Sequence, residues 1–270
     1  MEKKFANNGF GKRLKSMLKV DFRRMCTTPF FYIMVGISFV VPILILVMTT
    51  MMDGSVSVNP QTGEETVMEG FKNVWQILGA VSSTGGDAAG MSMDLVSMCN
   101  INMMYFAVAV LVCIFVSDDF RSGYAKNLFT VRAEKTDYVI SKTLVGFVGA
   151  AAMFTAFFLG AMIGGGIVSL PFETVGFNGG NILACMLSKI LLSTVFVAVC
   201  VLASVIGKQK TWLSILLSLG FGMLFFTMIP MVTPLDSTVV NVGLCLVGGG
   251  LFGFGLGAIS NQVLKKTALV

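Results

Sequence analysis

The chain has 270 residues, of which 55% are hydrophobic and 12% are charged, and it contains no histidine. Soluble domains typically carry about 25% charged residues, so this composition, with a mean hydropathy of +0.85, excludes an ordinary soluble domain and indicates a protein that crosses a membrane several times. The absence of histidine removes the commonest general base and the commonest metal ligand. The six cysteines lie singly, without the paired spacing of a metal site, and are typical of apolar packing.

Residues 1–28 predict an amphipathic interfacial helix. Apolar side chains recur at spacings of three and four, and basic side chains fill much of the other side. Such a helix lies in the headgroup plane with its basic face toward anionic lipid or a protein partner. The alternative is a positively charged anchor with no further role. The residues that define the predicted helix are Phe10, Leu14, Leu18, Phe22, Arg23 and Arg24.

Six charge-poor runs follow along the chain, and about 20 apolar residues suffice to cross the hydrocarbon core. Segments on one side of these runs hold 17 of the 19 lysines and arginines, which marks that side as cytoplasmic. We therefore predict an all-α membrane protein with six spans, both termini in the cytoplasm, and a single membrane domain over residues 1–270. The runs are 25–52, 95–117, 143–172, 190–207, 211–235 and 237–264.

Residues 53–100 predict an extracellular loop rich in acidic side chains. Within it, Phe71, Trp75 and Leu78 share one helical face, which indicates a short helix on the membrane surface with Trp75 at the interface. Two interpretations are open for this loop: a plain connector, or a small cap over the spans.

Lys189 interrupts the apolar stretch that contains the fourth span. A lysine at the bilayer centre costs about 2.5–3.5 kcal/mol on insertion scales. A span over residues 190–207 would rise about 27 Å at 1.5 Å per residue, which places Lys189 near the outer interface, where its side chain can reach water. The alternative is that Lys189 faces a central cavity and contacts an anionic group of a cargo molecule.

Glycines recur every four residues in two of the predicted spans. Gly160 and Gly164 lie in the third, and Gly249, Gly253 and Gly257 lie in the sixth. This spacing lets helix backbones approach closely. We expect it to pack helices within the chain, with a homodimer face as the alternative.

Residues 117–142 predict a cytoplasmic coupling loop that docks on a soluble partner. The loop holds five basic and four acidic residues between two apolar runs. Asp118 and Asp119 follow the second apolar run, Gly123 comes next, and Lys142 lies at the entry to the third span.

This loop, the basic amphipathic helix, the large first outer loop and the six spans together resemble an ABC-2 type transporter permease, the type V exporter fold. The resemblance implies a half-transporter in the bacterial cytoplasmic membrane, which pairs with a second permease subunit as a homo- or heterodimer. Each permease would dock on a separate ATPase subunit that binds ATP and Mg²⁺, so this chain needs no cofactor and is not an enzyme. The resemblance also implies a short coupling helix over residues 124–129, followed by a basic turn at Arg132. The implied docking residues are Asp119, Arg121, Gly123, Tyr124, Asn127 and Phe129, with Arg132 and Lys135 at the rim.

Small bacterial members of this family include lantibiotic-immunity permeases and exporters of phenol-soluble modulins. The resemblance therefore implies an amphipathic peptide or a hydrophobic drug as cargo, with lipid but no nucleic acid as a further partner. Two other classes stay open: a non-transporting scaffold or sensor that signals through residues 117–142, and a stand-alone channel or ion-coupled carrier. An ATPase encoded beside this chain would favour the exporter.

Overall fold

The computed structural model describes residues 10–58, 65–67, 70–80, 99–130, 134–174, 176–226 and 228–266. In these ranges the chain is helical, apart from loops and a small antiparallel hairpin of strands β1 (Val56–Val58) and β2 (Glu65–Val67). In the described ranges, five segments are long and apolar enough to cross a membrane, as expected of an α-helical multi-pass membrane protein. They are α2 (Pro29–Met52), η4 with α4 (Ile101–Met103 and Met104–Arg121), α6 (Lys135–Val168), α7 (Gly179–Gly207) and α10 (Val239–Lys266).

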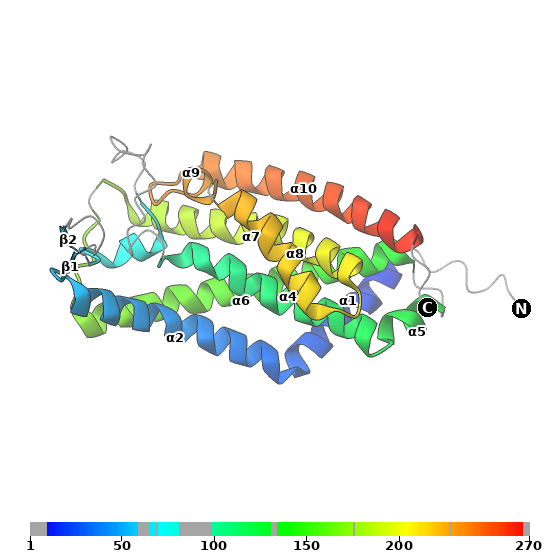
Figure 1. Ribbon diagram of the computed structural model, residues 1–270. Coiled ribbons are helices and arrows are strands. Elements are labelled where there is room, and N and C mark those ends of the chain that lie inside the picture. Colours follow the sequence, from blue (N-terminus) through cyan, green and yellow to red (C-terminus); the bar gives the residue numbers. More distant parts are fainter. Residues whose placement is uncertain are drawn as a thin grey trace, which may run out of the picture.

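The long helices lie side by side in an elongated bundle (Figure 1). One end carries α1 (Phe10–Thr27), α5 (Tyr124–Thr130) and the last turn of α10, and we call it the α5 end. The opposite end carries the β1–β2 hairpin, and we call it the hairpin end. Helix α8 (Thr211–Phe226) packs on α4 and α7, and the short α9 (Ile229–Val232) follows it.

The helix bounds differ from the predicted spans wherever a charged residue is buried. Helix α4 continues to Arg121 and α6 already begins at Lys135, so the connection between them is shorter than the predicted loop over 117–142. Helix α7 begins at Gly179 rather than at residue 190. The predicted spans end at charged residues, whereas Asp119, Lys142 and Lys189 have polar partners inside the bundle.

The helix observed in the predicted fifth span is shorter than the run over 211–235. Helix α8 has 16 residues, which corresponds to a rise of about 24 Å. It is apolar, but it falls below the length of the five long segments.

Glycines on α6 bring its backbone into contact with α2. A Cβ atom at Gly160 would overlap the Phe39 carbonyl oxygen and lie 2.8 Å from Pro42 Cγ, and one at Gly164 would lie 3.0 Å from Ile43 Cα. On α10, a Cβ at Gly249 would lie 3.0 Å from a backbone oxygen of α7. The glycine spacing therefore serves packing within the chain, as predicted.

Residues 70–80 of the predicted outer loop lie across the hairpin end. Their centre is the 3-10 helix η2 (Val74–Leu78), and Trp75 Nε1 donates to the Phe172 carbonyl at 3.1 Å. The Leu235 amide donates to the Ala80 carbonyl at 2.8 Å, which closes the contact on the other side. This part of the loop therefore forms a cap. Its buried side chains are Phe71, Val74, Ile77 and Leu78.

Candidate functional site

A buried charge cluster joins three helices at the α5 end. The side chains of Asp21 on α1, Asp119 on α4 and Lys142 on α6 are all 0% exposed. Lys142 Nζ lies 2.8 Å from Asp21 Oδ1 and 2.7 Å from Asp119 Oδ2. Because an unpaired buried charge is strongly unfavourable, this one ammonium group holds α1 and α4 against α6.

Arg24 completes the cluster and makes its formal charge zero. Its Nη1 atom lies 2.6 Å from Asp119 Oδ1. Burial lowers the pKa of Arg24, but the adjacent Asp119 carboxylate, together with Tyr124 and Asp21, raises it above its ordinary value. Ser141 Oγ donates to Asp21 Oδ2 at 2.6 Å, and the Tyr138 hydroxyl donates to Asp119 Oδ2 at 3.0 Å. Both oxygens of each carboxylate are thereby satisfied.

Aromatic rings connect this cluster to α5. The guanidinium carbon of Arg24 lies 4.1 Å from the centre of the Tyr124 ring, a cation–π contact. Burial raises the pKa of the Tyr124 phenol, so this ring stays neutral beside the guanidinium. Further along α5, the Phe129 ring meets the Tyr138 ring edge-on, with their centres 5.4 Å apart. Helix α5 is therefore held to α1 by a cation and to α6 by a ring pair.

The other side of α5 is open. Gly123 has φ +74°, a left-handed conformation that favours glycine, and it turns the chain from α4 into α5. Ala125 then faces inward, whereas Arg121, Lys126 and Asn127 are exposed. The α4–α5 turn and the outer face of α5 thus present polar side chains to the outside, while the inner face of α5 is fixed to the bundle.

The predicted docking residues divide into two groups. Arg121 and Asn127 are accessible, while Asp119 is fully buried, so the predicted direct contact of Asp119 with a partner is corrected to a role inside the bundle. Lys135 also turns inward: its Nζ donates to the Leu264 carbonyl in the last turn of α10 at 2.7 Å. Gly123, Tyr124 and Phe129 are half-buried. Arg132 lies outside the described residues.

The amphipathic character predicted for residues 1–28 holds in α1, but the helix packs on α6. Its buried positions are Met17, Asp21 and Met25, and Leu14, Leu18 and Phe22 are half-buried beside them. Phe10 and Arg23 are exposed. Arg24 was expected on the outer basic face, and the structure turns it inward because Asp119 lies there.

Asp21 is the site residue that sequence reasoning missed. It is an acid among many basic residues, and it lies four positions from both Met17 and Met25, hence on their side of the helix. An ionisable group on the apolar side of an amphipathic helix signals a partner inside the fold. That signal was available in the sequence.

Lys189 is buried in the half of the bundle nearest the hairpin end. Its side chain has no exposed surface, and Nζ lies 2.8 Å from Asn102 Oδ1 and 2.9 Å from Thr233 Oγ1. The expectation that it reaches the outer interface is therefore wrong. It also presents no surface to a cargo molecule in this conformation. The hydroxyl of Tyr105 donates to the Lys189 carbonyl at 2.9 Å and adds to the same polar contact.

The Lys189–Asn102 hydrogen bond predicts a stability effect. Replacing Asn102 by leucine is expected to lower the free energy of unfolding by about 1.5–3 kcal/mol, because a buried ammonium loses one of its acceptors. Denaturant unfolding in detergent micelles would measure this change. In a Lys189→Met background the same replacement should cost clearly less, and equal costs in both backgrounds would contradict the assigned bond.

Within the described ranges, no three His, Cys, Asp or Glu side chains gather closely enough to hold a metal ion. Comparisons with known proteins found no match: no protein-family model, no curated protein and no solved structure matches this chain. The residues and geometry of the α5 end are therefore the basis for a functional proposal.

Proposed function

We propose that this chain is the transmembrane permease subunit of an ATP-driven exporter of the ABC-2 type. The observation that carries the proposal is α5, a seven-residue helix between two long apolar helices, with an exposed polar face and a back fixed to the bundle. A partner that moves α5 would move the permease with it. The exposed side chains Arg121 and Asn127 are the proposed contacts with a separate ATPase subunit, which would bind ATP and Mg²⁺.

The proposed topology has six spans, with α8 and α9 together as the fifth. The α5 end is proposed to be cytoplasmic, because the segments that hold 17 of the 19 lysines and arginines include the ends of α1, α5 and α10. The membrane is proposed to be the bacterial cytoplasmic membrane, and the cap over 70–80 would face outward.

The buried charge cluster supports a mechanism for transmitting motion. Breaking a buried pair by removing one partner costs about 3–5 kcal/mol, so the helices tied by Asp21, Asp119 and Lys142 are expected to move as one unit. The contact between Arg24 and Tyr124 connects α5 to this unit. Closure of the ATPase around ATP would then shift α1, α4 and α6 together relative to α7 and α10.

The proposed cargo is an amphipathic peptide or a hydrophobic drug, and the proposed assembly contains two permease subunits. Helix α10 exposes large apolar side chains along its length, with Phe254 82% and Leu251 69% exposed. Such a surface suits acyl chains, a second subunit or an apolar cargo. Lys189 is left out of the proposed cargo path because it is buried.

Charge reversal at Arg121, the exposed last residue of α4 before the turn into α5, tests the docking proposal. Arg121→Glu is expected to weaken binding of the ATPase subunit by at least about tenfold. The introduced glutamate would repel an acidic group of the partner that the arginine attracts. Co-purification of tagged chain from mild detergent, followed by ATPase assay, would measure this loss. Lys266→Glu is the matched control, since it makes the same charge change on the exposed end of α10.

Equal retention of the ATPase by Arg121→Glu and Lys266→Glu would contradict docking through α5. Absence of any ATPase from the purified wild-type chain would contradict the exporter itself. That second result would favour the scaffold or channel alternatives.

A further inference from the structure

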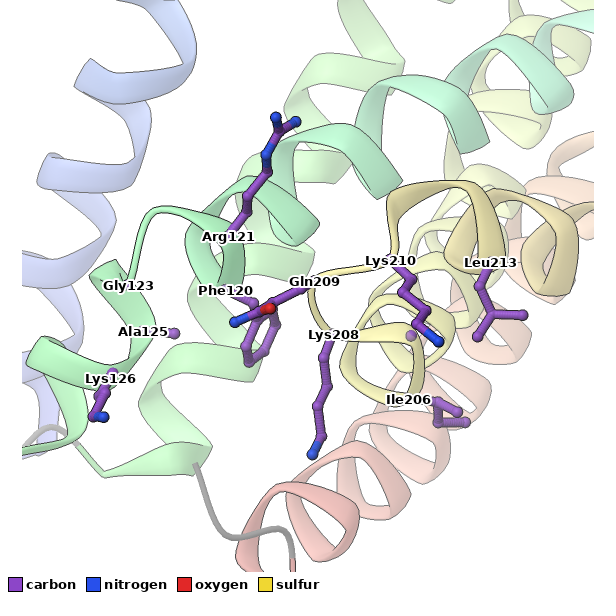
Figure 2. A pocket seen from close by; sticks show the side chains of 11 residues that line it. Phe120, Arg121, Gly123, Ala125, Lys126, Ile206, Lys208, Gln209, Lys210 and Leu213 are labelled. Atoms are coloured by element: carbon purple, nitrogen blue, oxygen red, sulfur yellow. The ribbon is translucent and has the colours of Figure 1, made fainter. Parts of the chain in front are cut away.

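A groove of about 640 Å³ lies at the α5 end between two chain turns. One side is the turn from α4 into α5, and the other is the turn from α7 into α8 (Figure 2). The α5 side contributes Arg121 and Lys126, and the α8 side contributes Lys208 and Lys210. Two turns that are distant in sequence thus bring four cations to one groove.

These cations are not neutralised by neighbouring acids. Among the described residues, no aspartate or glutamate lines the groove, and none of the four cations forms an ion pair with any of them. Asp119, close by in sequence, already forms ion pairs with Lys142 and Arg24. In Figure 2 the Lys126 and Lys208 side chains extend to one side of the groove and Arg121 to the other. The groove therefore has a positive potential that attracts an anion.

Apolar side chains line the same groove. Phe120, Ile206 and Leu213 contribute to its wall, and Ile206 is 47% exposed. Trp212, beside this wall in sequence, is 66% exposed, and exposed tryptophan is typical of a membrane–water interface. A free inorganic anion needs no such apolar wall, whereas a molecule with an anionic head and acyl chains does.

The backbone holds Lys208 in place at some conformational cost. Lys208 has φ +51°, in the left-handed region that favours glycine. The preceding Gly207 packs so closely on α8 that a Cβ atom there would overlap Ser214 Oγ. Unfavourable backbone conformations persist where the surrounding structure enforces them, and they gather at binding sites.

We propose that this groove binds the phosphate-bearing headgroup of an anionic phospholipid from the cytoplasmic leaflet. Basic pockets between membrane helices on the cytoplasmic side are suited to such headgroups. The proposal rests on the proposed orientation of the chain in the membrane, but it does not require an ATPase or a cargo. A bound lipid would bridge the α4–α5 turn and the α7–α8 turn, and so fix the position of α5.

The test uses the full chain purified in a neutral detergent. Native mass spectrometry with added phosphatidylglycerol or phosphatidylcholine would count retained lipids and give their relative affinities. Phosphatidylglycerol is expected to bind more tightly. The double variant Lys208→Gln/Lys210→Gln is expected to weaken its binding about 25-fold, taking each lysine near an anionic surface as worth about a fivefold change.

The matched control is Lys265→Gln/Lys266→Gln, which removes two exposed lysines from the end of α10. It should leave lipid affinity unchanged. Equal weakening by both double variants, or no preference for phosphatidylglycerol, would overturn the proposal. Displacement of the lipid by an equal concentration of inorganic phosphate would assign the groove to a free anion instead.

A groove for an acidic segment of a partner protein would give a different result. Lys208→Gln/Lys210→Gln would then keep its affinity for phosphatidylglycerol but lose a co-purifying protein, and this outcome would also overturn the lipid proposal. Because the lipid measurement needs no ATPase, it can fail or succeed independently of the exporter proposal.

Discussion

Replacing Lys142 by methionine is expected to lower the free energy of unfolding by about 3–5 kcal/mol. The change leaves Asp21 and Asp119 buried with Arg24 as the remaining cation, so the cluster carries an uncompensated negative charge. Methionine has a similar length, so lost packing contributes little. Denaturant unfolding in detergent, with recovery of monodisperse protein as a second readout, would measure the effect.

A second variant separates charge from packing. Asp21→Asn in the Lys142→Met background restores a neutral cluster, since Asp119 and Arg24 still pair, and the introduced amide oxygen can still accept a hydrogen bond from Ser141. The double variant should therefore be more stable than Lys142→Met alone. A double variant that is as unstable as the sum of its two single variants would show that the charges do not interact as assigned.

Replacing Gly160 by alanine is expected to destabilise the chain by about 1–3 kcal/mol, the usual cost of overpacking. The added methyl group would overlap the Phe39 carbonyl oxygen of α2. A backbone atom cannot rotate away as a flexible side chain can, so α2 and α6 have to separate along their shared contact. Unfolding in detergent would give the size of the effect.

Gly166→Ala is the control on the same helix. Nothing lies within 4 Å of a Cβ atom at Gly166, so the methyl group fits, and alanine's helix propensity is expected to add up to about 1 kcal/mol of stability. Opposite signs for the two glycine variants would support the α2–α6 contact. A similar small effect for both would contradict it.

The sequence predicts the membrane class and most helices of this fold because both depend on local composition. Apolar runs identify the five long helices of the described ranges. The short helix that the family resemblance implies over residues 124–129 corresponds to α5 (Tyr124–Thr130). The cap over residues 70–80 was one of two open interpretations. The long helices and the cap follow from hydropathy, turn residues and helical period.

The charge cluster could not be predicted in the same way. The apolar runs put Asp119, Lys142 and Lys189 at the edges of spans, because a charge in an apolar run is costly unless it is paired. Whether it is paired depends on residues that are distant in sequence: Lys142 reaches Asp21 across 121 positions. A single sequence does not say which distant residues meet, so the apolar runs predict these three helices too short at the charged ends.

The same separation along the chain has a consequence for how the protein is made. Asp21 and Arg24 leave the ribosome first, and the 121 residues that separate Asp21 from Lys142 take about 6–24 s to synthesise at 5–20 residues per second. During that interval Lys142 has not yet been synthesised, so Asp21 has no partner inside the bundle. An amphipathic helix can lie at the membrane surface, so we expect α1 to dock late, after the third long helix has entered the bilayer.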